Sequence, residues 1–503
     1  MAADIRKTYA ELETHFKQYS TLSGISGVLG WDMQVNMPPK GAPKRADQIA
    51  MISGLAHERL TSPKVGEMIA ALKNANGELN EAERANVREM ARDYERATKV
   101  PQELVEELSR QESLAHEVWG RAREKADFAM FAPELEKLVK LSKQLADAYG
   151  WQGTPLNALI EGFEPGATVD SLTRLFDEVK AVTVPLAEKV ISSPVKAKFE
   201  FEKNRFAAEK QKAFGETLIE KIGFDKQAGR LDTSIHPFCS GGLGDVRLTT
   251  RYNEHAPQQA IFGIIHEMGH GLYEQGVAPE TYGTPLSEAL SYGLHESQSR
   301  MWENYIGRSL PFWKQFYPVL LQQFAKELDG MSVEDWVLAV NHVERSLVRV
   351  EADELTYDLH IILRFEIERD LFAGVISVSD LPKVWNKKVE TYLGVTPPDD
   401  GKQGVMQDVH WSSGAFGYFP SYSVGNIAAG QLWKKMNQDM PAMNKQIETG
   451  NFAEILEWLR THVHRLGRRY SRDELLIKAT GKPLGTDGYL NYLTEKFGSL
   501  YQL

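Results

Sequence analysis

The chain has 503 residues, of which 42% are hydrophobic and 25% are charged. These values are typical of a globular protein with a large buried core. The net charge of −11 argues against a nucleic-acid partner, because contacts to phosphates require a basic surface.

The cysteine content and the hydropathy pattern indicate a compartment. Cys239 is the only cysteine, so no internal disulfide can form, and we predict a cytoplasmic protein in a reducing environment. The N-terminal residues are polar, unlike a secretory signal. No apolar run approaches the roughly 18 residues that a transmembrane helix needs, so we expect no membrane partner.

Helical periodicity dominates the chain from its start, where Ile5, Leu12 and Phe16 mark one apolar face. The segments 81–99 and 102–124 are rich in Glu, Arg and Ala, and we expect a hairpin of long exposed helices with solvated charges. Further helices are predicted over residues 169–190, 205–222, 257–275, 285–305, 310–328, 333–372 and 451–466.

The stretch from Asp232 to Asn253 departs from this helical pattern. It contains Gly241-Gly242 and Gly244, followed by a β-prone run from Val246 to Thr250. We predict a small antiparallel β element here, next to the helix expected over 257–275. A strand in this place can pair with an extended peptide through main-chain hydrogen bonds, without regard to the peptide's side chains.

The most specific motif of the chain is His266-Glu267-Met268-Gly269-His270. Two histidines four residues apart lie on the same face of a helix and can bind one tetrahedral Zn²⁺. Glu267 follows the first ligand, so its carboxylate can take a proton from a metal-bound water that then attacks an amide. The alternative is a pair of histidines on a solvated helix face.

The flanking residues favour the metal site over that alternative. Pro257 suits the first position of a helix. Apolar residues repeat at helical spacing through the motif and predict a buried face: Ile261, Ile264, Ile265, Met268 and Leu272. Two imidazoles and a carboxylate are costly in an interior unless they bind something.

Catalytic zinc usually takes a third protein ligand and keeps one position open for water. The next predicted helix, capped by Thr284, offers Glu288 and Glu296. Glu288 would lie in its first turn, where the helix dipole already favours a carboxylate. Glu296 lies further along, after room for a loop and an antiparallel return. We therefore predict the ligands His266, His270 and Glu296 and keep Glu288 as the alternative, while His295 would contact substrate or a neighbour.

The loops between these elements are too short to separate independent domains. We predict one catalytic domain over residues 1–503, mostly α-helical and with two lobes around a cleft. The N-terminal helical lobe would cover about residues 1–200. The zinc site and the substrate groove would lie within about residues 230–430.

Six ordered blocks carry a resemblance to a known family. They are His236-Pro237-Phe238, Asp245-Val246-Arg247-Leu248-Thr249, the 266–270 motif, His295-Glu296-Ser297-Gln298, Val348-Arg349-Val350-Glu351-Ala352-Asp353 and Gly404-Val405-Met406-Gln407-Asp408-Val409-His410-Trp411. With them, essentially the whole chain resembles the carboxypeptidase Taq family of metallocarboxypeptidases. The N-terminal Trp31-Asp32 and Met37-Pro38-Pro39 are also similar to that family.

This resemblance implies a mostly α-helical fold with a deep central groove, like the neurolysin and angiotensin-converting-enzyme type. It implies removal of single residues from peptides with a free C-terminus, by a homodimer with a bound divalent metal. It assigns the metal to His266, His270 and Glu296 and the general base to Glu267. Zn²⁺ suits two histidines and a glutamate, and Co²⁺ or Mn²⁺ can occupy the same site.

Further site residues follow by analogy with related helical zinc peptidases, which use a His and then a Tyr about a dozen residues later to stabilise the oxyanion. His410 and Tyr422 match this spacing, and Tyr418 is the alternative phenol. The alternative interpretation of the segment is an aromatic-rich packed loop.

Recognition of the substrate's terminal carboxylate favours an arginine, because its planar fork binds carboxylate in a bidentate manner. We predict Arg349, on the long helix expected over 333–372, with Arg247 as the alternative. His236 and Phe238 would shape the closed end of the groove. Asp245 would hold a ligand histidine in one tautomer.

The sequence therefore predicts a metal-dependent carboxypeptidase that releases single C-terminal residues with broad specificity. A metallo endo-oligopeptidase or dipeptidyl carboxypeptidase with the same metal site is the second hypothesis. A non-catalytic helical peptide-binding scaffold is the third, and the presence of Glu267 argues against it.

Overall fold

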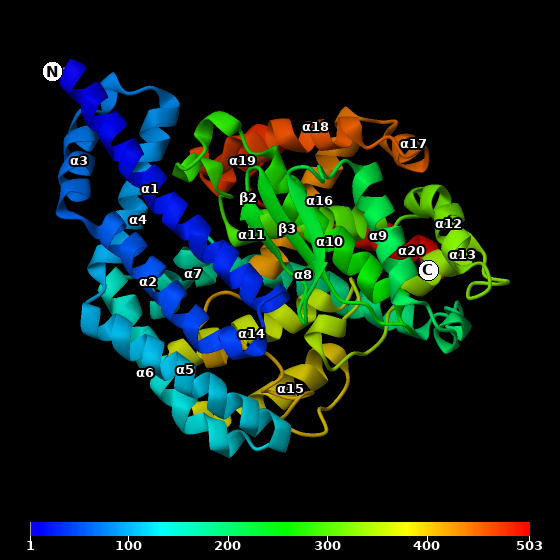
Figure 1. Cartoon of the computed structure of the whole chain (residues 1–503). Coiled ribbons are helices and arrows are strands. Elements are labelled where there is room, and N and C mark those ends of the chain that lie inside the picture. The colour runs from blue at the N-terminus through cyan, green and yellow to red at the C-terminus, as the bar shows by residue number, and fades with distance from the viewer. Residues whose placement is uncertain (1) are drawn as a thin grey trace.

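The computed structural model describes residues 2–503, and helices make up most of this range (Figure 1). The helices before the sheet are α1 Ala2–Val35, α2 Ala42–Thr61, α3 Pro63–Asn74, α4 Glu81–Lys99, α5 Gln102–Lys125, α6 Phe128–Tyr149, α7 Pro155–Phe163, α8 Val169–Ser192 and α9 Ala208–Ile222. The strands are β1 Gly229–Thr233, β2 Cys239–Gly242 and β3 Asp245–Thr250.

The helices that follow the sheet begin with α10 Pro257–Gly276, which carries the histidine motif. The others are α11 Tyr292–Arg300, α12 Leu310–Phe324, α13 Val333–Val340, α14 Tyr357–Phe372, α15 Leu381–Leu393, α16 Pro420–Asp439, α17 Met443–Glu448, α18 Ala453–His462, α19 Arg472–Thr480 and α20 Asp487–Tyr501. A π-helical segment, Met301–Gly307, continues α11. The prediction of a mostly α-helical fold with a small β element is confirmed.

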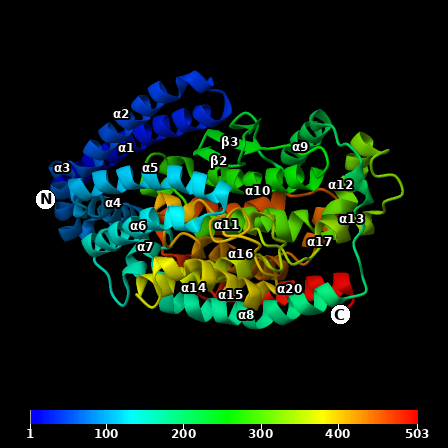
Figure 2. The same ribbon diagram turned by 90° about the horizontal axis from the view of Figure 1, so that it is seen from below.

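Buried apolar side chains form two clusters. The larger one draws on residues from Ala115 to Tyr501 and includes the inner face of α10. The smaller one lies among α1, α2, α3 and α4 and includes the predicted face residues Leu12 and Phe16. In Figure 2, α1 and α2 run side by side along one edge of the molecule, above the layers that contain α10, α11 and α16.

The sheet is mixed rather than wholly antiparallel. β2 pairs antiparallel with β3, with Cys239 opposite Leu248, as predicted. β1 pairs parallel with the other edge of β3, with Leu231 also opposite Leu248. The tight β2–β3 turn fixes their antiparallel pairing, whereas the longer connection from β1 lets that strand cross to the far side of β3 and run parallel to it.

The helix α10 lies between the sheet and the pair α11 and α16 (Figure 2). Two glycines permit this close packing. A Cβ on Gly269 would lie 2.6 Å from Cα of Ser299 on α11, and a Cβ on Gly425 of α16 would lie 2.6 Å from Cγ of Glu296. Both contacts are shorter than real Cβ atoms allow, so glycine at these positions lets α11 bring Glu296 to the histidines of α10.

Two predicted helices and one predicted helical hairpin differ from the structure. Residues 285–287 form only a 3₁₀ turn, and α11 begins at Tyr292, where Ser291 caps it by accepting from the backbone N–H of Leu294. Glu288 is therefore not in a first helical turn. It forms an ion pair with Arg468 at 2.9 Å instead.

The helix predicted over 333–372 is interrupted between α13 and α14, and Arg349 lies in a short 3₁₀ turn. A buried ion pair with Asp408 draws Arg349 away from a helical path. Asp353 also accepts hydrogen bonds from the backbone N–H groups of Leu355 and Thr356, which ends the irregular segment.

The predicted hairpin of 81–99 with 102–124 does not form. The two helices exist with nearly the predicted bounds, but α5 packs along α6 while α4 packs against α2 and α3. Among the described residues no helix combines the length and the apolar character that a membrane crossing requires.

Candidate metal centre

His266, His270 and Glu296 lie together at the contact of α10 with α11, and their ligand atoms are all within 4.8 Å of one another. Oε2 of Glu296 lies 3.7 Å from Nε2 of His266 and 3.3 Å from Nε2 of His270. Two bonds of about 2.0–2.1 Å that meet at a tetrahedral angle end roughly 3.3 Å apart. The three atoms therefore fit the coordination of a zinc-sized ion. The structure brings Glu296, and not Glu288, to the two histidines.

Each of these three residues is also held from behind. Nδ1 of His266 lies 2.8 Å from Oε2 of Glu303, which lies in the π-helical segment after α11. Nδ1 of His270 contacts His295, whose Nε2 lies 2.9 Å from Oε1 of Glu274. The prediction that His295 contacts a neighbour is thus confirmed. These contacts leave the Nε2 atoms of both ligand histidines facing Glu296.

Glu296 divides its two oxygens between two tasks. Oε1 accepts from Nε of Arg300 at 2.7 Å, and Oε2 faces the histidines. Burial favours the neutral acid, but Arg300 and then His266 outweigh it and hold the pKa of Glu296 well below its usual range. The carboxylate is therefore ionised, as a metal ligand must be.

Glu267 lies beside the cluster and lines the same cavity, with only 7% of its surface exposed. Burial raises the pKa of Glu267 to about 7. His266 opposes this change, whereas Glu296 and Glu303 add to it. A carboxyl group that titrates near neutral pH is suited to both accept and return a proton.

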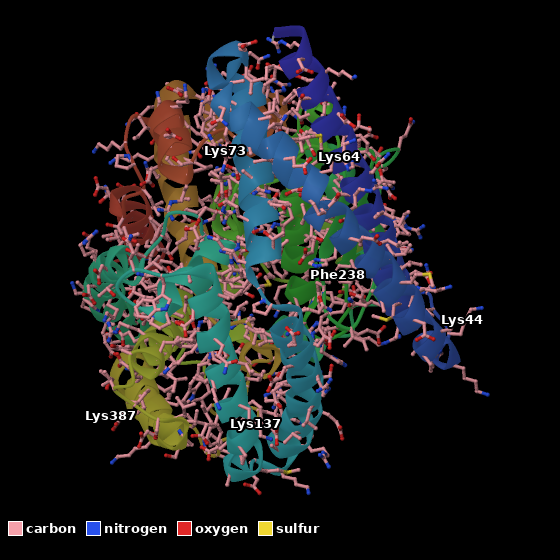
Figure 3. All side chains as sticks on the ribbon, turned by 90° about the vertical axis from the view of Figure 1, so that its left-hand side faces the viewer. Lys44, Lys64, Lys73, Lys137, Phe238 and Lys387 are labelled. Atoms are coloured by element: carbon pink, nitrogen blue, oxygen red, sulfur yellow. The ribbon has the colours of Figure 1, made fainter. Side chains whose placement is uncertain are left out.

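The cavity in front of the cluster has a volume of about 830 Å³ and is large enough for a peptide. Residues from distant segments line it: Tyr19 and Leu60 from the N-terminal helices, Pro237, Phe238 and Cys239 beside the sheet, and Ser291, Tyr292, Tyr418, Ser421 and Tyr422. In Figure 3 the N-terminal helices face the viewer, and the labelled Phe238 marks the sheet side of this cavity.

His410 and Tyr422 lie in hydrogen-bond contact, with 3.2 Å between Nε2 and the phenol oxygen. Tyr422 lines the cavity, as does the alternative phenol Tyr418, whose ring centroid lies 5.3 Å from that of Tyr422. His410 is not among the lining residues and contacts Tyr422 from behind. Burial lowers the pKa of His410 to about 4, so its imidazole is neutral.

Arg349 is 7% exposed and is held by Asp408, at 2.9 Å from both Nε and Nη2. Its Nη1 donates to the Tyr357 hydroxyl at 3.0 Å, and its guanidinium lies 5.0 Å from the centre of the Tyr422 ring. Arg349 therefore adjoins Tyr422, next to the cavity, but does not pair with Glu351, Asp353 or Glu354.

The remaining predicted residues lie near the sheet. Arg247 forms a bidentate pair with Asp245 and stacks on Trp31 at 4.3 Å, so Asp245 does not hold a ligand histidine. Glu303 contacts His266 and His295 contacts His270 in its place. His236 is exposed and does not line the cavity, whereas its neighbours Pro237 and Phe238 do.

Comparisons with known proteins agree with this geometry. The family model of the Carboxypeptidase Taq (M32) metallopeptidases matches residues 11–497. The chain belongs to this family. It is 40% identical to Carboxypeptidase 1 of Bacillus subtilis over 97% of both chains. It is also 40% identical to Thermostable carboxypeptidase 1 of Thermus thermophilus, over 98% of this chain and 99% of that one.

Solved structures of the same family share the fold. The crystal structure of M32 carboxypeptidase from Deinococcus radiodurans superposes with a TM-score of 0.96 at 38% identity, covering 99% of this chain and 100% of the other. Metallocarboxypeptidase 1 of Trypanosoma cruzi superposes with a TM-score of 0.93 at 35% identity, covering 98% and 99%. The chain is thus an enzyme of the metallocarboxypeptidase class, and its family membership implies a metal cofactor.

Sequence reasoning missed Arg300 and Glu303 behind the metal centre. Glu296, Arg300 and Glu303 follow one another at spacings of four and three, which places them on one side of a helical segment. That spacing could have predicted that Arg300 and Glu303 lie near Glu296. Glu274 gave no such signal, because its partner His295 lies on another helix.

We expect Glu303→Gln to weaken metal binding by roughly 10- to 100-fold, because the carboxylate that orients His266 is lost. Competition with a fluorescent chelator measures the affinity. Glu254→Gln, which alters an exposed pair with Arg205, is the matched control and should bind metal as the wild type does. Equal affinities for the two variants would show that Glu303 does not support the centre.

Proposed function

We propose that this metallocarboxypeptidase releases single C-terminal amino acids from peptides with broad specificity, with Glu267 as general base. One observation carries the proposal: the carboxylate of Glu267 lies in the same cavity as the cluster His266, His270 and Glu296. The proposed ligands and the proposed base thus line one cavity with space for a peptide.

The cluster of two imidazoles and one carboxylate would hold the metal, and we propose Zn²⁺, with Co²⁺ or Mn²⁺ as substitutes. A divalent ion there supplies Lewis-acid chemistry, lowering the pKa of water and polarising the scissile carbonyl. Glu267 would accept the proton of the attacking water on its carboxylate and deliver it to the leaving amine. Burial of Glu267 supports this role, since its raised pKa makes the second transfer favourable.

The hydroxyl of Tyr422 would donate to the oxyanion that forms during hydrolysis. His410 would position that hydroxyl through the contact at 3.2 Å. Burial raises the pKa of Tyr422 well above its usual value, so the phenol keeps the proton that it must donate. Tyr418, also in the cavity wall, would bind substrate beside it.

The terminal carboxylate of the substrate would meet Arg349, which adjoins Tyr422 and offers the Nη hydrogens not used by Asp408 and Tyr357. His236 would act at the closed end of the groove through its neighbour Phe238. Broad specificity is supported by the cavity wall, because aromatic and small residues from many segments form it rather than one charged pocket.

We further propose that residues 1–503 act as one catalytic domain, with an N-terminal lobe over about residues 1–200 and the groove region over about 230–430. We propose a homodimer, as the family resemblance implies, and a cytoplasmic location, as the single cysteine indicates. Sedimentation velocity on the metal-loaded protein measures the oligomeric state, and a monomer at all concentrations would rule the dimer out.

A mass-spectrometric time course on one peptide, with zinc-loaded protein, tests the function. We expect a ladder that shortens by one residue at a time from the C-terminus. The same peptide with an amidated C-terminus should be cut at least roughly tenfold more slowly, because Arg349 loses its bidentate carboxylate partner. Internal fragments, or loss of residues in pairs, would instead support the endo-oligopeptidase or dipeptidyl carboxypeptidase. A metal-loaded protein that cuts no peptide would support the scaffold.

A further inference from the structure

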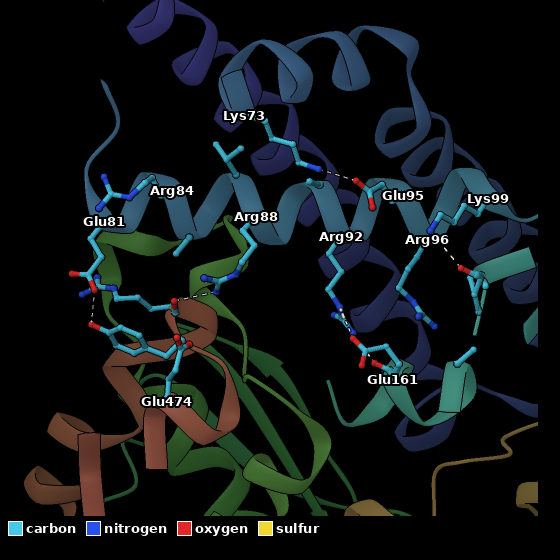
Figure 4. Close-up of a pocket in the computed structure, with 18 residues that line it drawn as sticks. Lys73, Glu81, Arg84, Arg88, Arg92, Glu95, Arg96, Lys99, Glu161 and Glu474 are labelled. Atoms are coloured by element: carbon cyan, nitrogen blue, oxygen red, sulfur yellow. Dashed lines mark hydrogen bonds and ion pairs between the residues drawn. The ribbon is translucent and has the colours of Figure 1, made fainter. Parts of the chain in front are cut away.

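A row of four arginines runs along one face of α4, outside the metal centre. Arg84, Arg88, Arg92 and Arg96 occur at every fourth position, so successive members are neighbours along the helix surface. In Figure 4 Arg88, Arg92 and Arg96 point toward the opposite wall, and Arg84 extends toward the N-terminal end of the helix. We call them the α4 arginine row. They line a second cavity of about 810 Å³, whose other lining residues include the end of α6, two residues of α7 and the segment from Arg469 to Glu474.

This second cavity continues from the metal cavity. Arg92, Arg96 and Tyr149 line both of them. From Arg96 to Arg84 the helix rises by roughly 18 Å, at about 1.5 Å per residue. That length corresponds to about five residues of an extended peptide. A peptide whose C-terminal end lies at the metal therefore has a continuous path along α4 for residues further upstream.

The side chains that line the second cavity carry more positive than negative charges. Seven lysines and arginines line it, against four glutamates, although the whole chain carries a net charge of −11. Lys73 pairs with Glu95 at 2.8 Å, and Arg92 pairs with Glu161 at 3.5 Å (Figure 4). These pairs use two of the four glutamates.

Arg88 pairs at 2.8 Å with Glu89, which does not line the cavity. The remaining cations of the wall, Arg84, Arg96, Lys99 and Arg469, have no carboxylate partner within the described residues 2–503. Arg84 donates to the backbone oxygen of Leu79, and Lys99 to that of Tyr149. The guanidinium of Arg96 lies 4.0 Å above the Tyr149 ring, and Nε of Arg469 is buried without a hydrogen-bond partner. Burial lowers the pKa of Arg96, which shows that neighbouring carboxylates do not fully compensate its charge. A carboxylate of a bound peptide would therefore form a favourable ion pair with Arg96.

We propose that the α4 arginine row is an exosite that binds acidic side chains of the peptide substrate, several residues upstream of the scissile bond. This inference rests on the proposed carboxypeptidase function and adds a substrate class to it. A peptide fits better than a polyphosphate or a nucleic acid, because the four glutamates in the wall would repel a densely charged anion. Spaced carboxylates on an extended chain can instead pair with separate arginines.

The test compares two peptides of about ten residues with identical C-terminal tripeptides. One has two glutamates and the other two glutamines, about five to eight residues from the C-terminus. We expect the glutamate peptide to have a higher kcat/KM at low ionic strength, by roughly fivefold, through a lower KM. The double variant Arg84→Gln/Arg96→Gln should bring this ratio close to one, and salt should reduce it in the wild type.

Two further variants sharpen the result. Arg110→Gln removes the same charge from an exposed site on α5 that lines neither cavity, and it should keep the wild-type ratio. Arg84→Glu should shift the preference toward a peptide with lysines at the upstream positions, an effect that loss of folding cannot produce.

The outcomes separate the two proposals. Equal release of the C-terminal residue from both peptides by the wild type, or an unchanged ratio in the double variant, would overturn the exosite and leave the carboxypeptidase proposal intact. If neither peptide loses its C-terminal residue, the proposed function is wrong and the exosite falls with it.

Discussion

Glu267→Gln is expected to lower kcat by roughly 10²–10⁴-fold while the protein still binds metal. The amide has nearly the size of the carboxylate but cannot accept a proton from water. Glu267 does not belong to the cluster of His266, His270 and Glu296, so the ligand set remains complete. Its burial gives bulk water little access to replace it as a base.

Two measurements belong to this prediction: the rate of C-terminal residue release at saturating substrate, and the metal content after dialysis. Glu280→Gln, an exposed glutamate shortly after α10, makes the same chemical change and should leave both values unchanged. If Glu267→Gln with full metal content retained wild-type kcat, another group would have to be the base.

Asp408→Ala is expected to lower the free energy of unfolding by about 3–5 kcal/mol. Asp408 lies between two buried guanidinium groups, 2.9 Å from Arg349 and 2.6 Å from Arg364, and Arg364 is completely buried. Burial favours the neutral acid, but Arg349 and Arg364 outweigh it and hold the pKa of Asp408 well below its usual range. Without the carboxylate, two cations would remain in the interior with no counter-charge.

The sign of the pKa shift sets the conditions for this measurement. A carboxyl group whose pKa is lowered by folding stabilises the protein fully above its unfolded pKa, and loses this contribution as the pH falls toward the folded value. Urea unfolding at neutral pH therefore measures the whole effect. Glu254→Ala breaks an exposed bidentate pair with Arg205 and should cost less than about 1 kcal/mol. Equal costs for the two variants would contradict the expected contribution of Asp408 to the free energy of unfolding.

The sequence by itself determined the elements whose causes are local. His266, Glu267 and His270 depend only on the spacing of one amphipathic helix, and the structure has that helix within one residue of the predicted bounds. The choice of Glu296 as the third residue of the cluster followed from its distance along the chain, and the structure brings it there. The six ordered blocks that resemble the family also predicted the class of enzyme. Short motifs contain the residues that carry out the reaction, so they indicate the activity even where the sequence between them does not predict the fold.

Local patterns failed where a distant partner overrode them. Glu288 was predicted in a helix, but Arg468, 180 positions away, draws it into an extended segment. Arg349 was predicted in a long helix, but its pair with Asp408, 59 positions away, interrupts that helix. For Arg349 the local preference is worth less than the buried pair with Asp408, since leaving one of these two charges uncompensated costs several kcal/mol.

The tertiary structure alone decided what surrounds the motif. It placed Glu303 and His295 behind the ligand histidines, where Asp245 had been predicted, and it paired β1 in parallel with β3. It also turned the charges of α4 from a solvated face into the wall of a cavity, by packing α7 and the segment after Arg468 against that helix. Helical spacing fixes which residues share a face, but only long-range packing decides what that face meets.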